Sequence, residues 1–363
     1  MGSRRKFMSR HATRMLKAGL SALYYSGAGE LMSPLTRGAG VVFMMHRVSP
    51  QPNASFEPNR ILRVTPDFLE TTVRQVIERG FDCISLDELP QRLASPPGER
   101  PFACFTFDDG YRDNRDYAFP ILRRYGVPHA LYVPTDYPEG RGDLWWLALE
   151  GAIGKAAQVV IESAGRSVVH PTRTVAEKDR AYDAIYWQLR ALPEVEARRI
   201  VATMAEAAGF DAASLCSDLI LDWDELREAA KDPLLTIGAH TCRHLALSKL
   251  AEAEASHEMS TSKQRIEAEI GRPCRHFSYP YGCEMAAGPR EFALARELGF
   301  TTAVTTRKGL VHREHSAELT AIPRLSLNGD FQAEKYVDVM LSGLPFAMWN
   351  AVRRVRGPVS GHP

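Results

Sequence analysis

The chain has 363 residues, of which 45% are hydrophobic and 25% are charged, as is ordinary for a globular protein of one large domain or two. Its formal net charge of +1 gives no overall reason to expect a nucleic-acid partner. No apolar stretch approaches the roughly 20 residues that cross a bilayer, and no clean apolar run follows the basic start, so we expect neither a membrane-spanning helix nor a cleavable signal peptide.

Basic residues gather in the N-terminal arm, residues 1–40, where Glu30 is the single acid. Residues 4–23 have the pattern of a basic amphipathic helix. The C-terminal tail, residues 336–363, combines Phe346 and Trp349 with a cluster of arginines. Basic residues beside large aromatic residues suit an anionic membrane surface, although such ends can equally pack on the domain or stay solvated.

Residues 41–142 alternate short apolar runs with helical patterns. Strands are predicted at residues 41–45, 81–86, 102–107 and 129–133. A helix is predicted to begin at Thr65, which can cap it, and to end at Gly80, and a second covers residues 114–125.

The alternation of strand and helix patterns is interrupted over residues 143–230, which we interpret as a mostly helical insertion. A small hairpin is predicted at residues 158–170 with its turn at Gly165, followed by helices at 177–192 and 194–208.

The alternation returns over residues 231–335. Strands are predicted at 234–238 and 300–305, and helices at 248–270 and 289–298. Repeated strand–helix alternation predicts a mainly parallel sheet with helices outside it. In a closed barrel of this kind the residues that follow the strands build the active site.

Polar residues with the chemistry of a hydrolytic metal centre follow three of the predicted strands. Asp108 and Asp109 come after residues 102–107, His46 follows residues 41–45, and His240 and His244 follow residues 234–238. Two carboxylates and two imidazoles spaced four apart can supply three metal ligands and one spare base. Each motif alone is weak, because Asp-Asp-Gly is a common turn and a single histidine is more often structural.

A third motif, Phe-Ser-Tyr-Pro-Tyr-Gly, occupies residues 277–282. It is compatible with a strand that ends in a tight turn. We expect Tyr279, Pro280 and Tyr281 to wall a sugar-sized groove, with backbone N–H groups near a reacting carbonyl.

In this order the motifs resemble those of the NodB-homology polysaccharide deacetylases, carbohydrate esterase family four. Thr-Phe-Asp-Asp-Gly stands at 106–110, His-Thr-Cys-Arg-His at 240–244 and Pro-Tyr-Gly at 280–282, and the likeness spans about residues 41–330. The resemblance implies a distorted (β/α) barrel and metal-dependent removal of acetyl groups from N-acetylglucosamine-containing glycans.

The resemblance also implies a role for each residue. Asp109, His240 and His244 would bind the metal, Asp108 would be the general base, and the Tyr281 N–H would steady the oxyanion. Zinc is the first expectation for a His₂Asp ligand set, with Co²⁺, Ni²⁺ or Fe²⁺ as alternatives, since ligand type alone does not select among them.

The chain departs from the family pattern twice. Many members carry arginine in the third motif, where this chain has Ser278; we expect Arg324, rather than Arg275, to reach the base instead. The late Leu-x-His motif that often supplies the general acid is absent, and His46 is the better candidate for that role.

The six cysteines show no CxxC spacing, and we interpret them as reduced thiols of a cytoplasmic protein. With the basic ends, this favours a peripheral enzyme at the inner face of the membrane that acts on lipid-linked or nascent glycans. Two alternatives remain: an amidase for a small non-sugar substrate, and a glycan-binding protein without catalysis.

Overall fold

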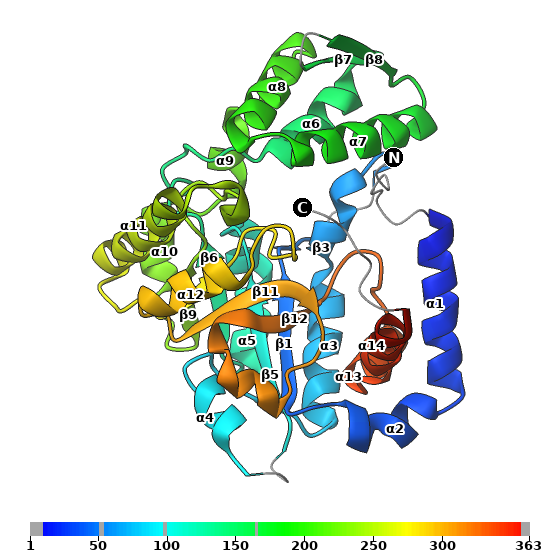
Figure 1. The fold of residues 1–363 in the computed structure, drawn as a ribbon, viewed down its shortest axis with the longest axis vertical. Helices are drawn as coiled ribbons and strands as arrows, with labels where there is room; N and C mark the ends of the chain where they lie inside the picture. Colours follow the sequence, from blue (N-terminus) through cyan, green and yellow to red (C-terminus); the bar gives the residue numbers. More distant parts are fainter. Residues whose placement is uncertain (1–9, 51–53, 97–99, 164–165, 357–363) are drawn as a thin grey trace.

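The protein forms a closed parallel barrel with helices outside it, as a computed structural model shows for residues 10–50, 54–96, 100–163 and 166–356 (Figure 1). The strands are β1 (Gly40–Met45), β2 (Arg47–Val48), β3 (Arg63–Val64), β4 (Asp82–Cys83), β5 (Phe102–Phe107), β6 (His129–Val133), β7 (Gln158–Ser163), β8 (Arg166–Pro171), β9 (Leu235–Ala239), β10 (His276–Ser278), β11 (Thr302–Lys308) and β12 (Ile322–Ser326).

Seven of these described strands make the ring, in the order β1-β12-β11-β10-β9-β6-β5, and β1 closes it by pairing with β5. Every pairing in the ring is parallel. The short strand β4 adds to the start of β5. The predicted (β/α) barrel is confirmed, and the carboxyl ends of all seven strands meet at one mouth.

The helices connect the strands and cover the ring. They are α1 (Arg10–Tyr25), α2 (Ala28–Thr36), α3 (Pro66–Glu78), α4 (Leu89–Ala94), α5 (Phe119–Arg124), α6 (Trp145–Lys155), α7 (Val175–Ala191), α8 (Glu194–Ala207), α9 (Ser214–Leu219), α10 (Trp223–Ala229), α11 (Glu252–Ile270), α12 (Pro289–Glu297), α13 (Glu334–Leu341) and α14 (Leu344–Arg356). The Thr65 side chain caps α3 by accepting a hydrogen bond from Phe68 N–H (3.3 Å).

Residues 143–230 contain a second hydrophobic core (Figure 1, green). The hairpin β7–β8 packs with α6, α7 and α8, and this core ends at Ile220; its turn at Gly165 lies outside the described residues. Trp223 and Leu226 of α10 belong to the main core of the barrel. The insertion is therefore a separate layer above the mouth, joined between β6 and β9.

The first two and last two described helices pack together on one side of the barrel. Helix α1 packs against α13, and α14 packs against α2 (Figure 1). The predicted N-terminal helix is present as α1 from Arg10, the first described residue; its predicted start at residue 4 lies outside the described residues, as do residues 357–363. No helix in the described ranges combines the length and the apolar character that crossing a membrane requires.

Two local predictions differ from the structure, and one strand of the ring was not predicted. The strand expected at 81–86 shortens to two residues, since only Asp82 and Cys83 pair with β5. The helix expected at 114–125 begins with a π-helical turn, Asn114–Ala118. Strand β12 was not predicted, because Pro323 and Arg324 interrupt its apolar pattern.

We predict that Phe43→Ala lowers the free energy of unfolding by about 3–5 kcal/mol, the range for large buried aromatic residues. Phe43 has no exposed surface, and its ring centroid lies 5.0 Å from that of Phe105 across the closing strand pair. Denaturant unfolding measures the loss. Phe43→Leu is the matched control and should lose much less; equal losses would contradict a packing role.

Candidate active site

The structure brings most of the sequence-predicted site residues to the carboxyl ends of the strands. His46 follows β1, Asp108 and Asp109 follow β5, and His240 follows β9. Tyr281 comes three residues after the end of β10, and Arg324 lies within β12.

Asp109, His240 and His244 form one compact buried cluster. Their ligand-type atoms all lie within 4.8 Å of one another. Asp109 Oδ1 is 3.6 Å from His240 Nε2 and 3.3 Å from His244 Nε2, and it has no hydrogen-bond partner in the described structure. Three buried donor atoms that converge without bonding one another have the arrangement of a metal-binding triad.

Backbone and side-chain hydrogen bonds fix the two histidines. His240 Nδ1 contacts the carbonyl oxygen of Ser278 at 2.5 Å, which leaves Nε2 as the atom that faces Asp109. The Thr241 hydroxyl accepts a hydrogen bond from His244 N–H (2.9 Å). Burial is the main cause that lowers the pKa of His240 to about 4 and holds the pKa of His244 well below its usual range, so both rings are neutral at pH 7.

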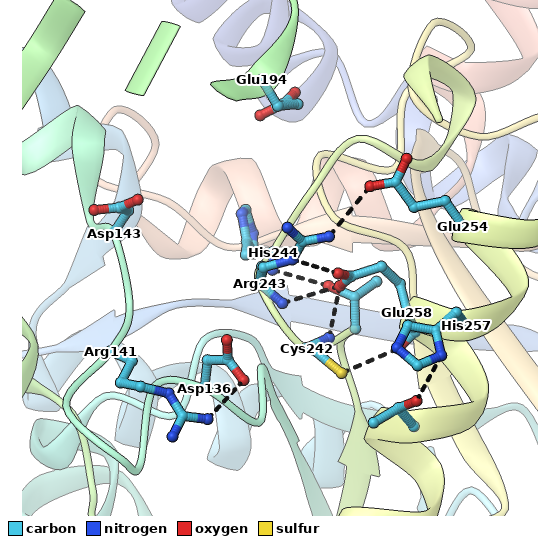
Figure 2. A network of polar contacts seen from close by, with 12 residues as sticks. Asp136, Arg141, Asp143, Glu194, Cys242, Arg243, His244, Glu254, His257 and Glu258 are labelled. Carbon is cyan, nitrogen blue, oxygen red and sulfur yellow. Dashed lines mark hydrogen bonds and ion pairs between the residues drawn. The ribbon is translucent and has the colours of Figure 1, made fainter. Parts of the chain in front are cut away.

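The loop that carries these histidines is held by Glu258 of α11 (Figure 2). Glu258 Oε2 accepts hydrogen bonds from the N–H groups of Cys242 and Arg243, each at 3.0 Å, and Oε1 accepts one from Arg243 Nε at 2.6 Å. A buried carboxylate that binds two consecutive N–H groups keeps the loop in one conformation. No sequence pattern indicates this role of Glu258, because the residue lies in an ordinary helical pattern.

Backbone strain concentrates at the site. In the described part of the chain, four non-glycine residues have positive φ: Asp109 (75°), Thr241 (64°), His244 (56°) and Tyr281 (60°). Each such residue costs of the order of 1 kcal/mol and persists only where its surroundings enforce it. All four belong to the three motifs, so the strain marks the segments that place functional groups.

Asp108 lies beside the triad in a buried ion pair with Arg324. Arg324 Nη1 and Nη2 donate to the two carboxylate oxygens at 2.8 and 2.7 Å, and Nη2 also donates to Ser278 Oγ at 3.0 Å. Burial acts to raise the pKa of Asp108, but the charge and hydrogen bonds of Arg324 outweigh it and bring the pKa to about 2. Arg275 lies elsewhere, 3.4 Å from Asp87.

Among the described residues, no arginine or lysine pairs with Asp109. Burial, followed by repulsion from Asp108, raises the pKa of Asp109 well above its usual range. The two adjacent carboxylates therefore have opposite environments. Arg324 keeps Asp108 ionised, whereas Asp109 is a buried carboxyl group without a cationic partner among the described residues.

His46 contacts the base from the other side. Its Nε2 lies 4.0 Å from Asp108 Oδ2, and its side chain is 21% exposed. Burial lowers the pKa of His46 despite the opposing effect of Asp108. His46 is thus placed between the base and the solvent.

Tyr281 lies directly beside His244, with 4.9 Å between the ring centroids. Its backbone N–H donates to no backbone oxygen among the described residues. Pro280, buried before it, sets the start of the turn. The structure places Tyr279 elsewhere, contrary to expectation: its hydroxyl donates to the Thr320 carbonyl (2.8 Å), and its ring packs in the core near Phe292.

The insertion covers this mouth with side chains that sequence reasoning did not assign to the site. The Trp146 ring lies 5.2 Å from that of His244, and Trp145 Nε1 donates to the Tyr281 hydroxyl (2.8 Å). Arg198 Nη2 donates to the His244 carbonyl (3.2 Å), and the Arg190 guanidinium lies 3.5 Å from the centre of the Tyr281 ring. In the sequence, the two adjacent tryptophans at 145–146 could have indicated that the insertion contributes side chains to the site.

A family model described as polysaccharide deacetylase matches residues 95–303, more than half of the chain. The chain belongs to the polysaccharide deacetylase family. It is therefore a hydrolase of the kind that cleaves the amide bonds of acetylated sugars, as the motifs predicted. The matched residues include Asp108, Asp109, His240, His244 and Tyr281, and they leave out His46 and Arg324.

Solved structures share the deacetylase fold at low sequence identity. The chain is similar to the Streptococcus pyogenes deacetylase PplD in complex with acetate (16% identity, TM-score 0.54, 83% of this chain and 97% of that one). It is also similar to BC0361, a polysaccharide deacetylase from Bacillus cereus (14%, 0.52, 83% and 68%), and to IcaB from Ammonifex degensii (16%, 0.51, 84% and 98%). A search of curated proteins finds no match.

We predict that Arg324→Met in this deacetylase destabilises the fold by about 3–5 kcal/mol, because it leaves the Asp108 carboxylate buried without its partner. Arg324 is 1% and Asp108 2% exposed. The double variant Arg324→Met/Asp108→Asn should recover part of the loss. Urea unfolding of the four proteins in this cycle measures the coupling, and additive losses would contradict a direct pair.

Proposed function

We propose that the protein is a metal-dependent N-deacetylase that hydrolyses the acetamide of N-acetylglucosamine units in oligo- or polysaccharides and releases acetate. The observation that carries the proposal is the pairing of an unsatisfied Asp109–His240–His244 cluster with a buried, ionised Asp108 beside it.

The residues present fit a divalent metal ion. Asp109 Oδ1 is buried without a hydrogen bond, and the Nε2 atoms of His240 and His244 point at it from 3.6 and 3.3 Å. The three residues would hold the ion, with Zn²⁺ as the first choice and Co²⁺, Ni²⁺ or Fe²⁺ as alternatives. When bound, the ion would supply a Lewis acid that lowers the pKa of a water molecule and polarises the acetyl carbonyl.

The chain's own residues would accept and donate the protons of the reaction. Asp108, held in place by Arg324, accepts a proton as the water oxygen bonds to the acetyl carbon. The Tyr281 N–H donates to the carbonyl oxygen as it gains negative charge. When the carbon–nitrogen bond breaks, the sugar nitrogen takes up a proton. We assign this transfer to His46, 4.0 Å from Asp108: it takes over the proton that Asp108 accepted from the water and passes it to the nitrogen, so that both residues return to their starting protonation states.

The enclosed site supports a second candidate. Asp109 is 2% and His244 5% exposed, and the insertion covers the mouth. A tightly closed site suits an amidase with a small substrate that uses the same residues. Family membership favours the sugar substrate, and a substrate panel that contains both kinds separates the two.

We propose that the enzyme works in the cytoplasm. Its six cysteines are free thiols, and four of them (Cys104, Cys216, Cys242 and Cys274) are buried. Such thiols persist where the surroundings are reducing.

We predict that the wild-type protein, loaded with zinc or cobalt, releases acetate from N-acetylglucosamine oligomers. Asp109→Ala should lose both metal binding and activity. Asp108→Asn should keep the metal and lose activity by about 10²–10⁴-fold, because only the base is removed. Acetate assays and metal content per chain are the measurements. Metal retained by Asp109→Ala would contradict the ligand assignment, and metal-loaded wild type that binds saccharide without releasing acetate would indicate a binding protein.

We predict that His46→Gln keeps the metal and the stability of the wild type and lowers kcat with little change in KM. The glutamine amide can still form hydrogen bonds but cannot carry a proton. Steady-state kinetics over a range of pH measures the effect. A change in KM alone would indicate that His46 binds substrate and transfers no proton.

A further inference from the structure

A second site is built at the other end of the barrel, where the strands begin. A cavity of about 430 Å³ opens there between the residues that precede β1 and β5, the end of α4, and the segment after β11. Four arginines and one histidine line it: Arg37, Arg92, Arg100, Arg313 and His312. It shares no residue with the catalytic mouth.

Two of the arginines that line this cavity, Arg37 and Arg313, have no carboxylate within 4 Å in the described part of the chain, and Arg313 donates to the Pro96 carbonyl (2.6 Å). Arg92 and Arg100 are already engaged: both pair with Asp82, at 3.1 and 3.4 Å, and both donate to backbone carbonyl oxygens. Two guanidinium groups without a carboxylate partner beside a cavity of this size suit a phosphate group, which guanidinium groups bind in a bidentate manner.

An apolar face lies next to the cavity on the same helix. Leu31 and Leu35 of α2 are one turn apart and each 80% exposed, and Pro34 beside Leu35 lines the cavity. The neighbouring helix α14, which packs on α2, exposes Trp349 by 64%. Large apolar side chains beside a cationic cavity form the two halves of an amphipathic surface.

We propose that this end of the barrel docks on an anionic lipid membrane, with a headgroup phosphate in the arginine-lined cavity and Leu31 and Leu35 inserted at the level of the headgroups. Charge complementarity selects this occupant: Arg37 and Arg313 are cations without a carboxylate partner in the described structure, and the exposed Glu30 of α2 is paired with Arg79 (3.9 Å). No described helix can span a bilayer, so the contact is peripheral.

The docked orientation constrains the substrate, a consequence that rests on the proposed deacetylase function. Strand β1 runs from the cavity end at Gly40 to the catalytic end at Met45. The five steps from Gly40 to Met45, at about 3.3 Å each, separate the two ends by about 17 Å. An acetamide bonded close to a lipid anchor cannot reach Asp108 in this orientation, whereas the outer units of a longer glycan can.

Vesicle co-sedimentation of the full chain tests the proposal. The probes are vesicles of phosphatidylcholine alone and of phosphatidylcholine mixed with phosphatidylglycerol, beside titration with inorganic phosphate. We expect binding only to the anionic vesicles, weakened by high salt. Arg37→Gln/Arg313→Gln should reduce the partition coefficient by about five-fold per arginine, and Leu31→Ser/Leu35→Ser by about ten-fold or more.

Matched controls come from the insertion, beyond the catalytic mouth. Val195 is 75% exposed on α8, and Arg173 is an exposed arginine before α7. Val195→Ser removes an exposed aliphatic side chain and Arg173→Gln an exposed guanidinium outside the cavity lining, and both variants should bind vesicles like the wild type. Thermal unfolding of every variant reports whether the fold is kept.

Equal binding to both vesicle types would overturn the proposal, and so would undiminished binding by the two double variants. Binding of inorganic phosphate without binding of vesicles would also overturn it, because the cavity would then be a site for a soluble anion. Acetate release from soluble oligomers is assayed separately. Vesicle binding without acetate release would refute the proposed function alone, and acetate release without vesicle binding would refute the docking surface alone.

Discussion

The pairing of β1 with β5 closes the ring, and the position of every catalytic group depends on that closure. The two strands run in register over six residues, from Gly40 opposite Phe102 to Met45 opposite Phe107. At the first pair the backbones come so close that a Cβ on Gly40 would lie 2.4 Å from the Phe102 carbonyl oxygen, so glycine is required there. Since all strands of the ring are parallel, closure brings His46, Asp108 and His240 to one mouth.

The buried ion pair of Asp108 and Arg324 keeps a carboxylate ionised at this mouth. A carboxylate that is 2% exposed stays ionised only if a cation and hydrogen bonds replace its water. In the family pattern that arginine belongs to the third motif, where this chain has Ser278. The small serine side chain accepts a hydrogen bond from Arg324, which comes from β12 on the far side of β11. The serine and the relocated arginine are thus two parts of one rearrangement.

Sequence patterns correctly predicted the strands and the helix cap that depend on interactions within a few residues. The strands at 102–107 and 129–133 and the cap at Thr65 follow from apolar runs and hydrogen-bonding side chains that act within a few residues. The orientation of Tyr279 was missed although it follows from the same physics. Side chains alternate along β10 and the residue after it, so Phe277 and Tyr279 point into the core while Ser278 points to the site.

Other features could not be predicted because they depend on contacts between distant segments. Nothing local indicates that Glu258 holds the loop of Cys242 and Arg243, or that β12 completes the ring despite Pro323. The position of the insertion over the mouth could not be predicted either. It depends on where residues 143–220 dock, which their composition does not indicate.

The insertion limits access to the reacting groups. It is bonded to the barrel at two places: the Tyr182 hydroxyl donates to Asn59 Oδ1 (2.8 Å), and Arg198 donates to the His244 carbonyl (3.2 Å). Asp109 and His244 are 2% and 5% exposed beneath it, whereas the His46 side chain, 4.0 Å from Asp108, is 21% exposed. Under the proposed function, the acetamide must therefore reach Asp108 past His46 or after the insertion has moved.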